Sequence, residues 1–302
     1  MKISTKSHIS LRLCFVFLFA FFLEEGVLWY FDHDATLFVR YQEFDRSQSV
    51  IDQGLQFYTP KKIQTLRVDE AFLFSLIQQS RGQMLPENLK EKYKNDPFSR
   101  LFDMNHPIRD IVFRRNLATP PINQPSGNTT YSINFPYRQF LYDPWDDLLF
   151  KALYCDISGY DDTDFFLLTT RGDSVGGYAD THVLLGLLFL EKNQCFDSEK
   201  IQSYKKTFVR HIISAEERDV VFSDLYAERI VFLFWSGYGN TVKKEWIAVV
   251  RKNIKSDFGW RWQPSDTESS AHATGLALLA LIYENNQNTE SSFSSRSNLL
   301  FP

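Results

Sequence analysis

Three segments in the second half of the chain are apolar on almost every side when they are written as helices. They cover residues 179–190, 226–235 and 272–283. Aligning Thr181, Ala227 and Thr274 gives spacings of 46 and 47 residues, and apolar residues coincide after each aligned position. A helix without a polar face must be buried on all sides. The repeat therefore predicts three inner helices.

Amphipathic segments alternate with these apolar ones. Residues 198–214 and 242–254 each carry one apolar stripe, made of Ile201, Tyr204, Phe208 and Ile212 in the first and Val242, Trp246, Val250 and Ile254 in the second. Half-buried helices that alternate with fully buried ones indicate an outer ring around an inner ring, because one hairpin cannot bury its apolar surface alone. The predicted fold is all-α: an α/α toroid, a closed or incomplete barrel of helical hairpins.

The remainder of the chain is less regular. Residues 117–134 (LATPPINQPSGNTTYSIN) are rich in proline, glycine and small polar residues, which is typical of a loop. This loop separates an irregular, mostly helical part (residues 30–116) from the repeat region (residues 135–284). Two helices are predicted before the loop, over residues 68–79 and 86–94. The tail, residues 285–302, is rich in serine and asparagine and is predicted to be disordered.

The N-terminal segment, residues 1–29, has the features of an export signal. Lys2, Lys6 and Arg12 precede an apolar run of eleven residues, 13–23. The run falls short of the ~20 residues that cross a bilayer as a helix. No clear small-residue cleavage site follows, so a membrane anchor and an N-terminal core helix remain alternative interpretations. We expect an exported protein, located in the periplasm, in the cell envelope or outside the cell. The alternative is a protein that is associated with the membrane through its N-terminus.

Composition excludes one class of partner. The chain is 44% hydrophobic and 23% charged, as in ordinary globular proteins, and it is rich in aromatic residues. Its formal net charge is −4 and no long basic stretch occurs, so we expect no nucleic-acid partner.

Cys155 and Cys195 are the only cysteines beyond the N-terminal segment. In an oxidising compartment they would pair and close a loop of about forty residues. The alternative is a pair of buried free thiols, and the sequence leaves both interpretations open. Neither cysteine lies in a zinc-binding pattern, so no metal and no cofactor are expected.

The turns that precede two inner helices resemble the repeats of terpene cyclases and protein prenyltransferases. Residues 257–262 (DFGWRW) lead into SSAHATGLALLAL, and residues 173–185 (DSVGGYADTHVLL) repeat the arrangement. In those families an acidic residue and a Gly-aromatic turn precede an inner helix. The resemblance covers roughly residues 140–284 and implies the α/α toroid. It does not specify a reaction, because toroids host glycan lyases, glycosidases, cyclases, transferases and non-catalytic domains.

One short motif carries a more specific resemblance. Residues 159–163 (GYDDT) resemble the DxDDT motif of class II terpene cyclases, with Gly159 in place of the first aspartate. The resemblance implies that Asp161 is a proton donor to an alkene and that Asp162 follows it. The alternative is that one of the two aspartates caps the helix that begins here. The Asp-x-Cys pattern of the prenyltransferase zinc site does not occur.

Candidate site residues gather near the expected starts of the inner helices. If these helices are parallel, carboxylates and imidazoles meet at one end of the barrel and form an acid/base site. The predicted catalytic residues are Asp161, Asp162, Asp180, His182, Glu228 and His272. The predicted substrate-binding residues are Tyr178, Arg229, Trp235, Tyr238, Trp260 and Trp262. Each of them also has a structural interpretation as a helix cap, an ion pair or a packing residue.

Two main hypotheses of function follow. The first is an exported enzyme whose acid/base site acts on a glycan or another extracellular polymer, since carboxylates and aromatic rings suit glycoside chemistry. The second is a non-catalytic envelope domain that binds a partner, a glycan or an apolar small molecule. A terpene-cyclase-like activity ranks third.

Overall fold

The computed structural model describes residues 47–84, 86–103, 106–111, 144–170 and 175–297. Within these ranges every regular element is a helix, and the one extended pairing is an isolated bridge between Trp260 and Ser270. The predicted all-α class is confirmed. The N-terminal segment and the Pro/Gly-rich loop lie outside the described residues. The chain divides into two units, Met1–Ser49 and Val50–Pro302, and the architecture below is that of the second unit.

The repeat in the sequence corresponds to three buried helices, α8 (Tyr178–Asn193), α10 (Asp224–Ser236) and α12 (Ala271–Ser297). The aligned residues Thr181, Ala227 and Thr274 each have 0% of their surface exposed. The apolar residues that follow them are mostly buried as well. The three helices predicted from the repeat are therefore present and buried.

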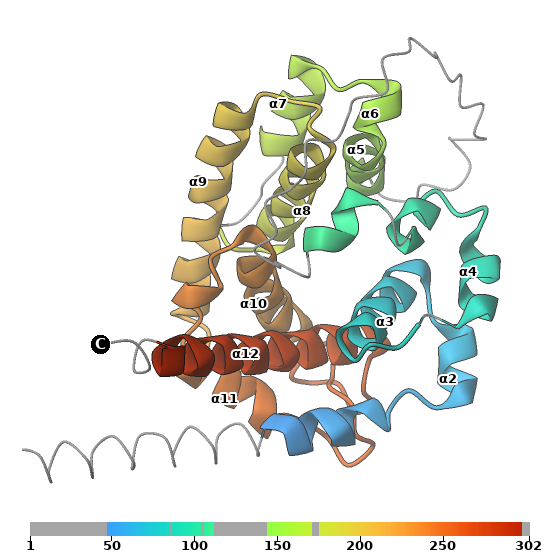
Figure 1. The fold of residues 1–302 in the computed structure, drawn as a ribbon, viewed down its shortest axis with the longest axis vertical. Helices are drawn as coiled ribbons and strands as arrows, with labels where there is room; N and C mark the ends of the chain where they lie inside the picture. The colour runs from blue at the N-terminus through green and yellow to red at the C-terminus, as the bar shows by residue number, and fades with distance from the viewer. Residues whose placement is uncertain (1–46, 85, 104–105, 112–143, 171–174, 298–302) are drawn as a thin grey trace, which may run out of the picture. The chain divides into compact units, whose positions relative to one another are not determined.

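These helices belong to a longer row. Helix α8 packs between α5 (Pro144–Leu153) and α10, and α10 packs between α8 and α12. Helix α12 in turn packs against α3 (Val68–Ser80), which comes from the N-terminal part of the chain (Figure 1). Gly275 allows this last contact, because a Cβ atom there would lie 2.9 Å from the Cβ of Leu73. The row thus runs α5–α8–α10–α12–α3.

Amphipathic helices cover this row from outside. Helix α9 (Ser198–Glu216) lies along α8, and α11 (Lys244–Lys252) lies against α12 (Figure 1). Their apolar stripes are buried at Ile201, Phe208 and Ile212 in α9 and at Trp246 and Val250 in α11. Tyr204 departs from the prediction and is 40% exposed. Helix α7 (Asp162–Thr170) packs on α5 and α8.

Shorter elements complete the described chain. They are a helix over residues 47–55, α2 (Pro60–Thr65), α4 (Glu87–Tyr93), the 3-10 helices η1 (Ser99–Phe102), η2 (Pro107–Ile111) and η3 (Gly239–Thr241), and α6 (Cys155–Ser158). No helix in the described part of the chain is both long and apolar enough to cross a bilayer.

Cys155 and Cys195, whose pairing the sequence leaves undecided, form a disulfide. Cys155 begins α6, Cys195 follows α8, and their Cα atoms are 5.9 Å apart. The bond closes a loop over a sequence separation of 40 residues. Loop-closure entropy of the unfolded chain gives such a bond a stabilising effect of about 4 kcal/mol.

The tail was predicted to be disordered from residue 285, but the structure has a helix there as far as Ser297. Helix α12 starts in the core at Ala271 and continues to Ser297, well into the segment 285–302. The residues from 285 to 301 include neither proline nor glycine. Adding residues to a formed helix is much easier than nucleating one, so the buried first half propagates the helix into the polar sequence.

Candidate functional site

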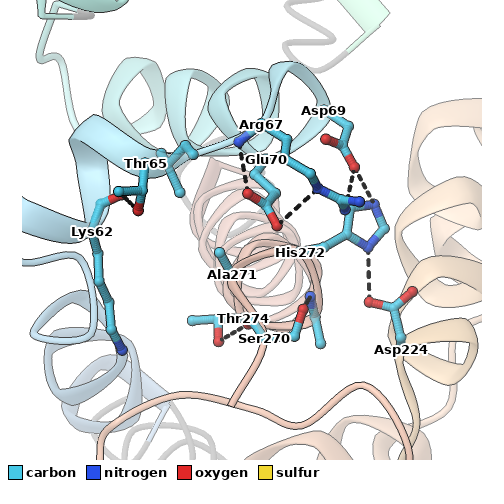
Figure 2. A network of polar contacts seen from close by, with 12 residues as sticks. Lys62, Thr65, Arg67, Asp69, Glu70, Asp224, Ser270, Ala271, His272 and Thr274 are labelled. Atoms are coloured by element: carbon cyan, nitrogen blue, oxygen red, sulfur yellow. Dashed lines mark hydrogen bonds and ion pairs between the residues drawn. The ribbon is translucent and has the colours of Figure 1, made fainter. Parts of the chain in front are cut away.

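The N-terminal ends of four helices in the row lie next to one another. Tyr178 begins α8, Asp224 begins α10, and His272 and Asp69 are the second residues of α12 and α3. The His272 ring lies between Asp224 and Asp69 (Figure 2): Nδ1 donates a hydrogen bond of 2.8 Å to Asp224, and Nε2 is 3.9 Å from the Asp69 carboxylate. The Tyr178 hydroxyl donates to the other Asp224 oxygen at 3.2 Å. Starts of the predicted inner helices α8, α10 and α12 therefore lie together, and α3 joins them without having been predicted.

Three side chains form the centre of this site. Asp224 and Glu228 lie one turn apart on the same face of α10, and His272 approaches from α12. One oxygen or nitrogen atom of each lies within 4.8 Å of the others. Asp224 is 0% exposed and Glu228 5%, whereas the His272 side chain is 16% exposed. We call these three residues the Asp–Glu–His cluster.

The carboxylates hold a proton on His272. Burial alone would lower the pKa of this imidazole, because it penalises the charged form. The hydrogen bond to Asp224 and the negative charges of Asp224, Glu228 and Asp69 outweigh burial and raise the pKa to about 9. His272 is therefore an imidazolium at neutral pH.

The pKa of the Glu228 carboxyl group is raised, whereas the pKa of an exposed glutamate in an ion pair is lowered. Burial raises the pKa of its carboxyl group, and the neighbouring Asp224 charge adds to this effect. The positive potential of His182 and His272 and a hydrogen bond from Thr181 partly offset the rise. A raised pKa makes the Glu228 carboxylate a stronger base than a solvent-exposed one.

Aromatic rings lie beside the cluster. Tyr178 stacks on Trp262 with 6.0 Å between ring centroids, and Trp262 lies 5.3 Å from the His272 ring. Trp145, near the start of α5, lies 5.7 Å from the His182 ring. All five of these residues are partly exposed. The rings of Tyr178, Trp262, Trp145 and His182 lie beside His272 and two buried carboxylates. We call these four side chains the aromatic rim.

Asp180, predicted as catalytic, belongs to a separate network. Its carboxylate accepts hydrogen bonds from the Gly176 backbone N–H at 2.6 Å and from His211 Nδ1 at 3.0 Å. Arg229, predicted to bind substrate, donates to the Gly176 carbonyl at 2.6 Å and pairs with Asp219. The hydrogen-bond partners of both residues lie in α9, in the turn that follows it and in the segment around Gly176. Both residues tie that segment to the helices.

Asp161 and Asp162 are not brought to the cluster. Both are exposed, at the start of α7, where Asp161 accepts a hydrogen bond of 2.9 Å from the Asp164 N–H. Asp162 is 83% exposed and pairs with Lys200. The capping interpretation is confirmed for Asp161. Protonation of an alkene needs a water-poor surrounding, which an exposed cap does not provide.

Three predicted aromatic residues pack in the core or at its edge. The Trp235 indole donates to the Tyr283 hydroxyl at 3.0 Å, and the Trp260 indole donates to the Val250 carbonyl at 2.8 Å. Tyr238 is partly buried against the hydrophobic core. Trp235 lies eleven residues after Asp224, so the helical rise places it about 16 Å from the cluster end of α10. These residues stabilise the fold rather than line the rim.

The sequence missed Asp224, Thr181, Asp69 and Trp145. Asp224 had a usable signal: it lies 46 residues after Tyr178, at the equivalent position of the repeat, and Glu228 is equivalent to His182 in the same way. Extending the alignment to the helix starts would have placed Asp224 at the shared end. Asp69 lies before the repeat region, and Trp145 has no equivalent position in the three aligned helices, so no spacing indicated them.

The cluster is also the group in the described part of the chain with the donor atoms of a metal site: two carboxylates and one imidazole at short mutual distances. The sequence predicted no metal site because these donors come from two helices 44 to 48 residues apart. No protein-family model matches the sequence, and comparison with curated proteins and with solved structures finds no significant match.

Proposed function

We propose that this protein is an enzyme that cleaves a glycan by acid/base catalysis at the Asp–Glu–His cluster. The observation that carries the proposal is the convergence of Asp224, Glu228 and His272 within 4.8 Å beside an accessible aromatic rim. Buried acid/base groups brought together from distant parts of a chain are typical of active sites.

The hydrogen bonds assign a role to each group. Asp224 is fully buried and accepts from Nδ1 of His272, so it fixes the ring and leaves Nε2 as the nitrogen that exchanges protons. His272 donates its Nε2 proton to the glycosidic oxygen as the carbon–oxygen bond breaks. In hydrolysis, the Glu228 carboxylate takes a proton from the water that adds to the anomeric carbon. Tyr178 holds Asp224 through its hydroxyl and is a positioning residue.

The rim supports a sugar as the substrate class. Aromatic rings offer flat apolar faces to the carbon–hydrogen faces of a sugar ring, and His182 adds a polar edge. The disulfide supports an exported protein, because such bonds persist in oxidising compartments. The row α5–α8–α10–α12–α3 with its outer helices supports the α/α toroid, the arrangement in which helix starts share one end.

Activity of single variants on a panel of polysaccharides tests the proposal. The assay measures new reducing ends released by the purified wild type, and positive glycans are then used with the variants E228Q and H272N. We expect each variant to lose about 10²- to 10⁴-fold in kcat, the usual contribution of a general acid or base.

The matched control for E228Q is E217Q, because Glu217 is half exposed and pairs with Lys243 on the surface. It should cleave at the wild-type rate. Circular dichroism verifies that every variant is folded. A wild type that cleaves no glycan of the panel, or an active H272N, would refute the proposal and leave the envelope binding domain as the better function.

A further inference from the structure

The Asp–Glu–His cluster has the donors of a transition-metal site. It offers two oxygens and one nitrogen, and the Asp224–His272 pair is 2.8 Å apart. A tetrahedral zinc ion with bonds of about 2.0–2.1 Å needs donors about 3.3 Å from one another. All three donors lie within 4.8 Å of one another, so side-chain shifts of about 1 Å bring them to that spacing.

Each donor residue is also held by a neighbour that does not itself reach the centre. Tyr178 donates to the second oxygen of Asp224, and the Thr181 hydroxyl, which donates to the Tyr178 carbonyl at 2.9 Å, lies beside Glu228 and lowers the pKa of its carboxyl group. The nitrogen of His272 that does not face Asp224 points at the carboxylate of Asp69 (Figure 2). In metal sites such outer contacts fix the ligand orientation, and a carboxylate behind a histidine is a frequent one.

We propose that Asp224, Glu228 and His272 bind one Zn²⁺ ion. Two carboxylates balance its charge, which removes the cost of burying them beside each other. A nitrogen donor with two oxygen donors suits zinc better than the harder Mg²⁺ and Ca²⁺, which take oxygen donors. Three protein ligands leave the fourth position of the ion open toward the rim.

One consequence rests on the proposed function, whereas zinc binding itself does not. An ion held by Nδ1 of His272 replaces the proton that this nitrogen shares with Asp224, so the ring is no longer an imidazolium and its Nε2–H becomes a much weaker acid. The ion also engages Glu228, which then no longer accepts a proton from water. Zinc is then a reversible inhibitor of glycan cleavage, and a chelator restores the activity.

Metal titration tests the site directly. Chelator-treated full-length protein is titrated with Zn²⁺ in competition with a chromophoric chelator, and Co²⁺ absorption reports the coordination geometry. We expect one ion per chain and tetrahedral Co²⁺ bands. D224N, E228Q and H272N should each weaken zinc binding by at least about 100-fold, and Y178F and T181V by about 10- to 100-fold.

The matched control is H211N, which removes the other histidine–aspartate pair of the described chain, His211–Asp180. It should bind zinc as the wild type does. Melting temperatures show which variants are folded, and Y178F and T181V keep all three donors if the others unfold. Equal zinc affinity in wild type and in folded E228Q, T181V and Y178F would overturn the site. Zinc binding in a protein that cleaves no glycan would refute only the proposed function.

Discussion

Two histidine–aspartate pairs in this protein have nearly the same geometry and different surroundings. His272 donates to Asp224 at 2.8 Å, and His211 donates to Asp180 at 3.0 Å. The first pair lies among helix starts with Glu228 within reach, and the second joins α8 to α9 at a side chain that is 35% exposed. The comparison teaches that the pair alone does not make a site. The third carboxylate and the aromatic rim distinguish the functional candidate from the structural contact.

The largest expected difference concerns the two aspartates. D224A removes the fully buried carboxylate that accepts the His272 hydrogen bond, and breaking such a pair costs about 3–5 kcal/mol of unfolding free energy. D180A leaves the Gly176 N–H unsatisfied, which costs about 1–3 kcal/mol. Urea denaturation of both variants measures the two costs. A larger loss in D180A would reverse the comparison.

A smaller difference concerns pH. The folded-state pKa of His272, about 9, lies above the ordinary value of 6.5, so this group binds its proton more tightly in the folded protein. Its contribution to stability, about 3 kcal/mol, is complete below pH 6.5 and is lost as the pH rises through 9. Denaturation in a chelating buffer between pH 6 and 10 should show this decline in wild type and in H211N. The decline should be absent in H272N, and an unchanged decline there would assign it to other groups.

The smallest effect has the opposite sign. Because burial raises the pKa of Glu228, its charged form opposes folding at neutral pH. E228Q keeps the shape without the charge and should raise the unfolding free energy by about 1 kcal/mol while lowering kcat by about 10²- to 10⁴-fold, a trade of activity for stability that is common at active sites. E217Q, on the surface, should stay within about 0.5 kcal/mol of wild type. A destabilised E228Q would mean that the Thr181 hydrogen bond outweighs the burial of the charge.

The sequence predicted the helices better than their assembly. A helix that is buried on every side has apolar residues on every side, and this pattern can be seen in the sequence. The predicted starts of α8, α10 and α12 therefore differ from the observed ones by at most two residues. The place of α3 beside α12 was not expected. A short apolar helix fits many buried positions, and the contact depends on the close approach at Gly275, which no local pattern reveals.

The site was predicted in part for a similar reason. His182, Glu228 and His272 are predictable because they lie in the first turns of apolar helices, and the structure brings them together. Asp161 is indicated only by a short motif, and an aspartate before a helix serves as a cap wherever the helix lies. Asp224 also looks like an ordinary first-turn acid in the sequence. Only the packing of α10 against α12 distinguishes these two aspartates.

The meeting of four helix starts has an electrostatic consequence of its own. Each α-helix carries a macrodipole that amounts to roughly half a positive charge at its N-terminal end. The ends of α3, α8, α10 and α12 therefore give the cluster a field that favours negative charge, and Asp69 and Asp224 lie in the first turns where this field is strongest. The same field would stabilise negative charge that develops on a leaving oxygen. Because it arises from the backbone, no single side-chain substitution removes it.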